Sequence, residues 1–328
     1  MKDNIIQLIP SLITNRSLEL ILLPTEQCNF RCTYCYEDFS LGKMTRDVID
    51  GVKNLISKRA SELKFLKISW FGGEPLSARD IVYEISQHAK NICESNGIKF
   101  QGGMTTNAFL LTETVATKLY ILGIRNFQIS LDGPKKTHDL TRQRIDKSGS
   151  FERIWNNLLD LRNSKLLVSI ILRIHITPEN YESLFLLIED LKIYFGGDTR
   201  FKIFFKAIAN LGGKNAKNIQ TLNKDVKEIA IEKLIEAVDN KLNVISVKDS
   251  LVPFVCYAAQ ANSFMIRADG TIGKCTVALN DSRNSIGKIL KDGTMQFESG
   301  KILPWIRGVR TLDKNTLYCP LMGMDNEK

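Results

Sequence analysis

A repeated alternation of strand-like and helical stretches constrains this chain more than any other feature of its sequence. Apolar runs rich in β-branched and aromatic residues alternate with stretches of helical period from residue 18 to residue 240. Strands are predicted at 18–24, 65–70, 98–105, 125–131, 167–176 and 201–208, and helices at 45–59, 78–94, 112–122, 151–162, 181–194 and 224–240. This repeat predicts an α/β fold, a partial (β/α)6 TIM-like barrel with its active site at the carboxyl ends of the strands.

The regular repeat ends near residue 240, and the sequence beyond it is of a different kind. Two turn signals, Asp269-Gly270 and Asp292-Gly293, each lie between short extended stretches and predict hairpins. We therefore expect an N-terminal extension at 1–17, a barrel core at 18–240 and a small irregular region at 241–328. That last region is poor in apolar residues, so a bound metal would help to hold it together.

The charge of the chain limits the partners that it suits. The formal net charge is +9, but the basic residues are scattered and no run of five Lys or Arg occurs. We expect an acidic partner such as a peptide and do not expect nucleic acid. No apolar run reaches the roughly 18 residues that a membrane-spanning helix requires, and residues 1–17 make a poor signal peptide, which predicts a cytoplasmic protein with no membrane partner.

The cysteines indicate metal binding in place of disulfides. The chain has seven cysteines, an odd number, and a reducing cytosol keeps thiols free. Three of them, Cys28, Cys32 and Cys35, lie in CNFRCTYCYE just after the first predicted strand. Cubane iron–sulfur clusters normally use four thiolates, so three would leave one iron open to a small molecule with its own nitrogen and oxygen ligands. A zinc site with a fourth ligand elsewhere, or chance clustering, are the alternatives.

These residues resemble a known family. CNFRCTYCYE, with the aromatic Tyr34 just before the last cysteine, resembles the signature of the radical S-adenosylmethionine (radical SAM) enzymes. The resemblance implies a 4Fe-4S cluster that reduces bound SAM, yielding methionine and a 5′-deoxyadenosyl radical that abstracts a hydrogen atom. It also implies an external low-potential electron donor.

Further motifs follow the next strands and resemble the same family. WFGGEPL resembles the glycine-rich motif that grips the SAM ammonium, which implies cofactor-binding roles for Gly72, Gly73 and Glu74, although the stretch alone could be a β-turn. TTNAFLL resembles the stretch near the SAM ribose and implies roles for Thr106 and Asn107. Ala108 stands there where the family has Gly.

The fourth predicted strand leads into a pattern of the peptide-modifying branch. QISLDGPKKTHDLTR, followed by Gly149-Ser150-Phe151, resembles that pattern. It implies that Ser130 and Asp132 face the barrel mouth, and that Arg142 meets the SAM carboxylate or braces the loop.

Polar residues on the fifth predicted strand are weak candidates for catalysis. Alternation puts Arg173 and His175 on one side of LVSIILRIHITPEN and the aliphatic residues on the other. They contact SAM or substrate if that side faces the lumen, or His175 simply makes a hydrogen bond inside the barrel. The same two interpretations apply to Lys202 and Lys206 on the sixth predicted strand.

The C-terminal region holds three more cysteines, Cys256, Cys275 and Cys319. Their spacing resembles the start of the SPASM or "twitch" extension of radical SAM enzymes and implies one auxiliary 4Fe-4S cluster with an unidentified fourth ligand. Cys319 departs from the SPASM pattern because it has no cysteine three before or six after it. Buried structural thiols are the alternative, and Cys93 in a helical stretch is expected to be a packed core residue.

The resemblance implies oxidative modification of a ribosomally made precursor peptide. A carbon–carbon crosslink of cyclophane type or a thioether would both suit a chain with two clusters, and an acidic leader peptide would suit the net charge. No extra N-terminal domain is expected before the first strand. An anaerobic sulfatase-maturating enzyme, a peptide epimerase and a non-catalytic iron–sulfur electron-transfer module remain as alternatives.

Overall fold

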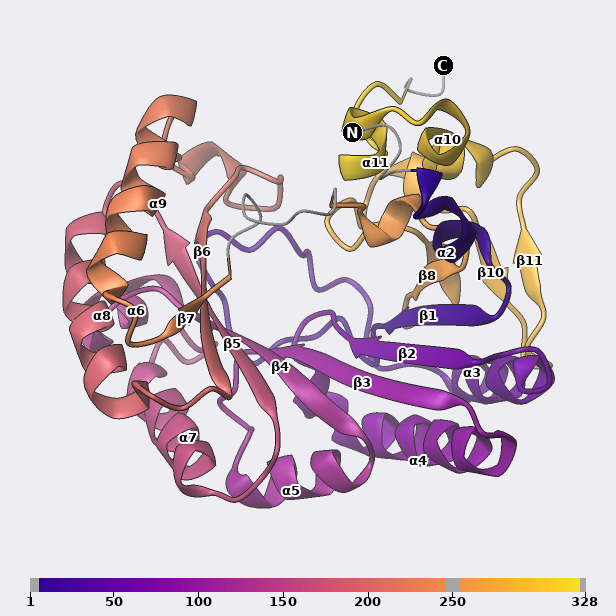
Figure 1. The fold of residues 1–328 in the computed structure, drawn as a ribbon, viewed down its shortest axis with the longest axis horizontal. Helices are drawn as coiled ribbons and strands as arrows, with labels where there is room; N and C mark the ends of the chain where they lie inside the picture. The colour runs from indigo at the N-terminus through magenta and orange to yellow at the C-terminus, as the bar shows by residue number, and fades with distance from the viewer. Residues whose placement is uncertain (1–5, 246–253, 325–328) are drawn as a thin grey trace. The chain divides into compact units, whose positions relative to one another are not determined.

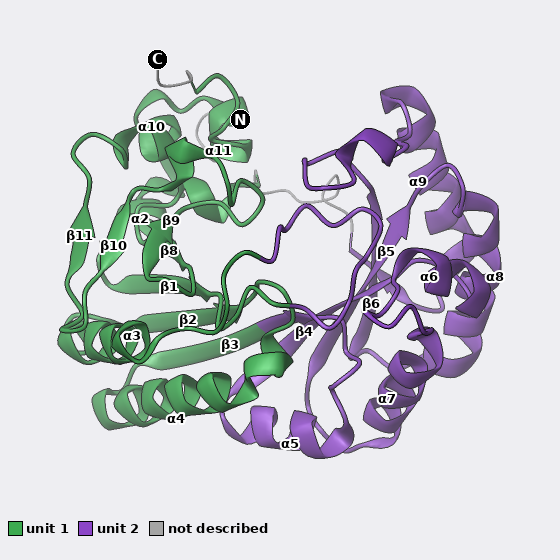
Figure 2. Cartoon of the chain, turned by 180° about the vertical axis from the view of Figure 1, so that it is seen from behind, with its two compact units in different colours: residues 1–27, 40–103, 247–328 green, residues 28–39, 104–246 purple. Residues whose placement is uncertain are grey.

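The computed structural model describes residues 6–245 and 254–324. The chain forms two compact units, coloured separately in Figure 2. Unit 1 comprises residues 1–27, 40–103 and 247–328, and unit 2 comprises residues 28–39 and 104–246. The boundaries predicted from the sequence at 17/18 and 240/241 divide the chain differently and stay a prediction.

Unit 1 is built on a sheet whose strand order is β11-β10-β9-β8-β1-β2-β3 (Figure 1). Its strands are β1 (Ser17–Leu22), β2 (Phe65–Trp70), β3 (Lys99–Thr106), β8 (Ser263–Ile266), β9 (Thr271–Gly273), β10 (Gly287–Ile289) and β11 (Met295–Phe297). β1 pairs in parallel with β2, and β3 extends to Thr106, across the division between the units. Its helices are α2 (Ile9–Ile13), α3 (Arg46–Arg59), α4 (Arg79–Asn96), α10 (Leu303–Thr311) and α11 (Lys314–Tyr318), with short 3-10 turns η1 (Pro75–Ala78), η3 (Tyr257–Ala259) and η4 (Ser282–Asn284).

Unit 2 continues the strand–helix repeat. Its strands are β4 (Ile124–Leu131), β5 (Ser169–Ile176), β6 (Phe201–Ala207) and β7 (Asn243–Val244), each parallel to the next. Its helices are α5 (Glu113–Ile121), α6 (Lys135–Thr141), α7 (Phe151–Asn163), α8 (Tyr181–Phe195) and α9 (Lys224–Val238), with the 3-10 turn η2 (Ala216–Asn218). Helices α7 and α8 cover one face of this sheet in Figure 1.

The six strands and six helices predicted from periodicity are all present, with ends that differ by at most two residues. Local chemistry sets several of these ends. Thr45 and Thr112 cap α3 and α5, since each hydroxyl accepts a hydrogen bond from the N–H three residues on, Val48 and Val115. Gly97 ends α4 in the left-handed conformation.

The C-terminal region is better packed than its composition suggested. Both predicted hairpins form, β8–β9 around Asp269-Gly270 and β10–β11 around Asp292-Gly293. In addition, β8 pairs in parallel with β1, a long-range pairing that the local sequence does not predict. Strand β8 is buried along its whole length, so this region shares the core of unit 1.

Side-chain alternation on β5 defines the two faces of the unit 2 sheet. Ile170, Leu172 and Ile174 are fully buried, which matches the aliphatic side predicted from the sequence. Ser169, Ile171 and Arg173 alternate with them and are only partly buried. The polar side of the strand is therefore the side away from the packed aliphatic core.

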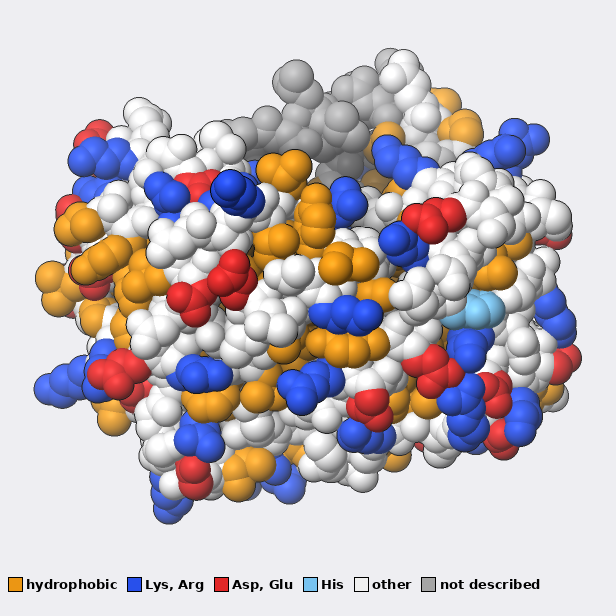
Figure 3. All heavy atoms as spheres, turned by 90° about the horizontal axis from the view of Figure 1, so that it is seen from below, with side chains coloured by type: hydrophobic (Ala, Val, Ile, Leu, Met, Phe, Trp, Pro, Cys, Tyr) orange, Lys and Arg blue, Asp and Glu red, His pale blue; other side chains and the backbone are white. Residues whose placement is uncertain are grey.

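The surface agrees with the scattered charge of the sequence. Figure 3 shows Lys and Arg interspersed with Asp and Glu on the face that it draws. Among the described residues, no helix is long and apolar enough to cross a membrane.

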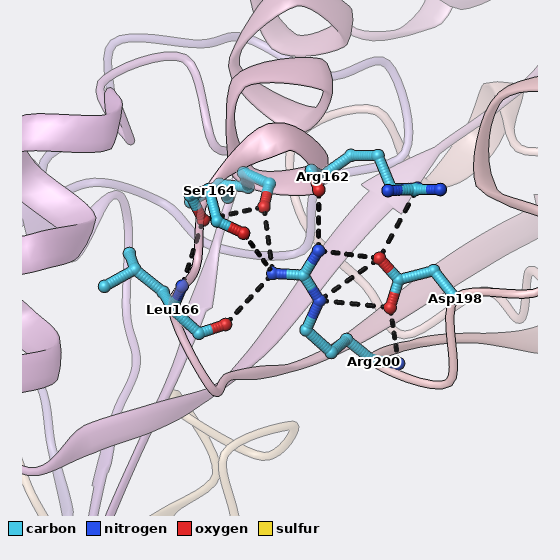
Figure 4. Close-up of polar contacts among 6 residues, drawn as sticks. Arg162, Ser164, Leu166, Asp198 and Arg200 are labelled. Atoms are coloured by element: carbon cyan, nitrogen blue, oxygen red, sulfur yellow. Dashed lines mark hydrogen bonds and ion pairs between the residues drawn. The ribbon is translucent and has the colours of Figure 1, made fainter.

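One partly buried arginine, Arg200, joins the end of α7 to the beginning of β6 (Figure 4). The Arg200 guanidinium donates to both carboxylate oxygens of Asp198. It also donates to the backbone carbonyls of Leu161, Arg162, Ser164 and Leu166. Carbonyls at the end of a helix have no partner within the helix, so Arg200 closes α7 and fixes the turn into β5, with the Ser164 hydroxyl as a second donor to Leu161.

We expect Arg200→Met to lower the free energy of unfolding by about 2–4 kcal/mol, because it leaves several partly buried acceptors and the Asp198 carboxylate without their donor. Urea denaturation followed by circular dichroism measures the change. Arg153→Met, at an exposed position on the same α7 helix, is the control and should change stability by less than about 0.5 kcal/mol. Equal effects of the two substitutions would contradict this role.

Candidate active site

The loop that carries Cys28, Cys32 and Cys35 follows β1 and is fixed within unit 2. None of the three cysteines is in a disulfide, and all three are partly buried. The N–H groups of Arg31 and Thr33 donate to the carbonyls of Gln143 and Thr141, at 2.8 and 2.9 Å. The cysteines are thus held by backbone contacts to the segment that follows α6.

The donor set of this loop suits an iron–sulfur cluster. The Cys28 sulfur accepts from the Phe30 N–H at 3.3 Å and lies 3.9 Å from the Asn107 amide nitrogen, contacts that favour a thiolate. Burial raises the pKa of Cys32, and it raises the pKa of Cys35 to about 12. Since a ligating sulfur must be a thiolate, cluster binding has to displace these protons.

Within the described ranges, no three His, Cys, Asp or Glu side chains converge on a position for a single metal ion. A cubane binds each cysteine on a different iron, so its cysteine sulfurs lie farther apart than the ligands of a single ion do.

Behind the cysteine loop lies a buried polar cluster centred on Asp132. The Tyr34 hydroxyl donates to Asp132 at 2.7 Å, and the Arg142 guanidinium donates to the same hydroxyl at 2.8 Å. His175 Nδ1 lies 3.1 Å from the other Asp132 oxygen and 3.1 Å from the Tyr34 hydroxyl. Four residues that the sequence singled out separately therefore meet at one place.

The electrostatics of the cluster keep Asp132 ionised. Burial alone would raise the pKa of Asp132, but the hydrogen bond with His175 and the charge of Arg142 hold it well below its usual range. Burial lowers the pKa of His175, although Asp132 opposes that shift, and it lowers the pKa of the neighbouring His138 to about 4. The cluster is thus built around a carboxylate that balances a buried arginine.

Sequence reasoning missed two residues that support this cluster. Asn180, 1 % exposed, donates through its side-chain amide to the carbonyls of Asp132 and His175, at 2.8 and 2.9 Å. Thr141 donates its hydroxyl to Asp132 at 2.8 Å. The polar residue that follows the predicted fifth strand in HITPEN was the available signal for Asn180, and no local pattern marks Thr141.

Thr106 and Asn107 lie at the carboxyl end of β3 and are almost fully buried. The Asn107 amide donates to the Asn29 side chain at 2.8 Å, beside Cys28 in sequence. Ala108 adopts a left-handed backbone conformation, with φ at 61°, so alanine keeps the conformation that glycine favours. Asn157 holds it there by donating to the Ala108 carbonyl at 2.8 Å.

Replacing Ala108 by glycine should relieve strain, because a left-handed conformation costs an L-residue about 1–2 kcal/mol and glycine loses part of that gain to backbone entropy. We expect Ala108→Gly to change stability by between 0 and about +1 kcal/mol. Ala108→Val should destabilise by more than about 2 kcal/mol, since its β-branch meets both the strained backbone and a fully buried site. Thermal unfolding of the pair tests this order, and its reversal would contradict it.

The glycines of WFGGEPL lie in unit 1, where they make a close backbone approach possible. A Cβ on Gly73 would lie 2.2 Å from the Gln27 carbonyl oxygen, and one on Gly72 would lie 2.5 Å from the Leu23 side chain. Both have positive φ, 41° and 81°. Glycine is therefore required at both positions to pack this turn against the segment leading to Cys28.

Glu74 is fully buried and also serves the backbone. Its N–H donates to the Gln27 carbonyl at 3.0 Å, and its carboxylate accepts from the Leu76 N–H at 3.0 Å, capping η1. The structure thus shows a turn-forming role for Glu74, and its predicted role as an acceptor for the SAM ammonium stays a prediction.

The three C-terminal cysteines come together within unit 1. Burial, together with the nearby Cys275 and Cys319, raises the pKa of Cys256 to about 11. The Cys256 N–H donates to the Leu317 carbonyl at 2.9 Å, which connects it to the short helix before Cys319. Asn284, unsuspected from sequence, fixes Cys275 by accepting its N–H and donating to its carbonyl. This set suits an auxiliary cluster, which remains a prediction. Cys93 is packed in α4, 1 % exposed.

Comparison with known proteins defines the class of this α/β protein. The model of the Radical SAM superfamily matches residues 22–191, which include the cysteine loop and strands β2 to β5. The chain belongs to the Radical SAM superfamily. Membership implies a 4Fe-4S cluster and SAM as cofactors.

Solved structures share the fold over most of the chain. The structure of anSMEcpe with bound AdoMet and Kp18Cys peptide matches 89 % of this chain and 83 % of its own, with a TM-score of 0.71 and 20 % identity. Streptococcus suis SuiB bound to precursor peptide SuiA matches 94 % of this chain and 70 % of its own, with a TM-score of 0.57 and 18 % identity. The predicted fold class, a partial (β/α)6 barrel with parallel strands, is confirmed.

Curated relatives that are similar in sequence are named GTP 3′,8-cyclases. A GTP 3′,8-cyclase of Haemophilus influenzae is 27 % identical over 173 residues, 52 % of this chain and 49 % of the cyclase. One from Clostridium botulinum is 32 % identical over 136 residues, 41 % of this chain and 40 % of the cyclase. The chain thus spans less than half the length of these curated relatives.

Proposed function

We propose that this chain is a radical SAM peptide maturase of the branch with SPASM or twitch extensions. It oxidatively modifies a ribosomally made precursor peptide, forming a carbon–carbon crosslink of cyclophane type or a thioether. The supporting observation is the extent of the structural match, 89 % and 94 % of this chain, to two proteins that were solved with bound peptides. The match to the cyclases covers 52 % of the chain or less.

The residues have the following roles in this proposal. Cys28, Cys32 and Cys35 hold the SAM-binding cluster, which supplies the electron that cleaves SAM. The polar residues at the ends of the strands bind and orient SAM, namely Tyr34, Gly72, Gly73, Glu74, Thr106, Asn107, Ser130, Asp132 and Arg142. The hydrogen bonds from Tyr34 to Asp132 and from Arg142 to the Tyr34 hydroxyl support this role, because they fix Tyr34 and Arg142 in one arrangement before SAM arrives.

The C-terminal cysteines Cys256, Cys275 and Cys319 hold one auxiliary cluster in this proposal. A second cluster at another potential can accept the electron that the product radical releases, which makes the reaction a net oxidation. An external low-potential donor reduces the first cluster. Residues 18–240 form the catalytic core and 241–328 the auxiliary region, in a cytoplasmic protein.

GTP cyclisation is a second candidate, favoured by the sequence likeness to the cyclases. The deciding experiment reconstitutes the protein anaerobically, reduces it with dithionite and measures 5′-deoxyadenosine with SAM alone, with GTP, and with peptides encoded by short reading frames beside the gene. We expect SAM cleavage, no consumption of GTP, and one peptide that loses two hydrogen atoms in mass.

Each alternative leaves a different signature in that experiment. Formylglycine formation exchanges the sulfur of one Cys for an aldehyde oxygen. At a Ser it removes two hydrogen atoms, as a crosslink does, but leaves an aldehyde that reacts with a hydrazide. Epimerisation leaves the mass unchanged in H2O but adds one deuterium in D2O. An electron-transfer module forms no 5′-deoxyadenosine while its cluster stays intact. Consumption of GTP with every peptide unchanged would overturn the proposal. For the epimerase, Cys93→Ala with intact activity excludes the one thiol outside the two cysteine sets.

A further inference from the structure

The polar face of the unit 2 sheet carries a set of cations at neighbouring positions. In the parallel register, Ser130 pairs with Arg173, and Arg173 pairs with Phe204, so the three lie side by side on one face. One layer nearer the carboxyl ends, His175 pairs with Lys206. Lys202 lies one layer in the other direction, beside Ile171.

The Arg173 side chain is partly buried, and its charge forms no ion pair with another described residue. Its Nε is buried and makes no hydrogen bond, and no ion pair to Arg173, Lys202 or Lys206 occurs among residues 6–245 and 254–324. Burial lowers the pKa of Arg173, which means that its charge is poorly compensated in the free protein. An unpaired buried cation is costly and marks a place for an anion.

The nearest carboxylate is already committed. Asp132 accepts from Tyr34 and Thr141, contacts His175, and balances Arg142. Lys206 is the more exposed of the two cations. Burial of Lys206 and the positive charge of the neighbouring Arg173 both lower the pKa of Lys206. The Tyr34 hydroxyl of the cysteine loop lies 3.1 Å from His175 Nδ1, two residues along β5 from Arg173 and on the same side of the strand, so the cations lie beside the loop predicted to carry the cluster.

We propose that Arg173 and Lys206 form a carboxylate-binding site that takes an acidic side chain of the peptide substrate. This inference rests on the proposed function and adds a requirement for an Asp or Glu in the substrate. The planar guanidinium of Arg173 fits a carboxylate through two parallel N–H···O bonds, and the flexible Lys206 adds a second charge at the rim. The methionyl carboxylate of SAM has the same chemistry and is distinguished by the test.

The test uses the reconstituted holoenzyme with two fluorescein-labelled ten-residue peptides that are identical except for four Glu in one and four Gln in the other. Fluorescence polarisation gives the peptide affinity, and equilibrium dialysis gives the SAM affinity. Arg173→Gln and Lys206→Gln are compared with Lys165→Gln, an exposed lysine of the same unit, before β5.

We expect the Glu peptide to bind wild type about 10–100-fold more tightly than the Gln peptide, as for a hydrogen-bonded charge pair. Arg173→Gln should remove that preference, Lys206→Gln should reduce it by about 2–5-fold as befits an exposed cation, and Lys165→Gln should preserve it. SAM affinity should stay within about twofold of wild type throughout.

Equal binding of the two peptides to wild type would overturn the site. So would an unchanged Glu preference in Arg173→Gln together with weaker SAM binding, since the anion would then be the SAM carboxylate. Circular dichroism confirms that each variant is folded. Formation of 5′-deoxyadenosine by the Lys165→Gln enzyme reports the proposed function separately, so failure of radical chemistry and failure of this site give different results.

Discussion

Cys32→Ala is expected to abolish SAM cleavage while the protein stays folded. Cys32 lies in the middle of the cysteine loop, partly buried and beside the Asp132 cluster, whose charges act on its thiol. Loss of one of three thiolates leaves a second iron without a protein ligand, so the cluster is lost or no longer binds SAM in a defined orientation. We expect 5′-deoxyadenosine formation to fall by more than about 100-fold, beyond the effect typical of an outer-shell partner.

Iron content and the cluster spectrum check this independently of turnover. With two clusters, wild type should hold about eight irons per chain, and Cys32→Ala and Cys256→Ala about four each. Only the Cys256→Ala protein should keep a cubane signal that changes on addition of SAM. Cys93→Ala is the control, since this thiol is packed in α4, and it should retain the full iron content. A SAM-responsive signal or full activity in Cys32→Ala would refute the assignment.

Asp132→Asn is expected to lower the free energy of unfolding by about 3–5 kcal/mol, because it leaves the Arg142 charge buried without its balancing carboxylate. The substitution keeps the shape of the side chain but converts one acceptor oxygen into a donor. That donor conflicts with the Tyr34 or the His175 contact. Asp160→Asn, exposed on α7, is the control and should have little effect.

The pH dependence of the free energy of unfolding gives a second way to compare wild type with Asp132→Asn. The folded pKa of Asp132 lies below its unfolded value of about 3.9, so the unfolded chain binds this proton first as the pH falls. The stability due to the carboxylate is therefore fully present above about pH 4 and is lost below it. The difference between wild type and Asp132→Asn, measured by urea denaturation, should shrink as the pH drops below about 4. A difference that is constant from pH 7 to pH 3 would show that ionisation of Asp132 contributes nothing.

His138 adds an acid sensitivity at higher pH. Burial lowers its folded pKa to about 4, against an ordinary value of about 6.5, so the unfolded chain gains a proton that the folded chain lacks between these values. Because the charge of Asp132 opposes that shift, Asp132→Asn should lower the pKa of His138 further, so changes between about pH 6.5 and 4 report His138 and changes below about pH 4 report Asp132.

The local sequence determined the strand–helix repeat, the helix caps and the places where strands end. The aliphatic alternation of β5, the threonine caps of α3 and α5, and the Asp-Gly turns are short-range effects that a few neighbouring residues fix. The cysteine spacing and the motifs at the strand ends indicated the superfamily for the same reason, since each lies within one loop.

Tertiary structure alone decided which of these residues meet. The pairing of β8 with β1 joins residues about 244 positions apart, and the Tyr34–Asp132–His175 contacts join three separate segments. Such contacts depend on the register of parallel strands, which is set by burial over the whole sheet. The uncompensated charge of Arg173 was likewise decided by tertiary structure. Whether a cation has a partner depends on the residues packed around it, and the sequence of the strand that carries it does not predict this.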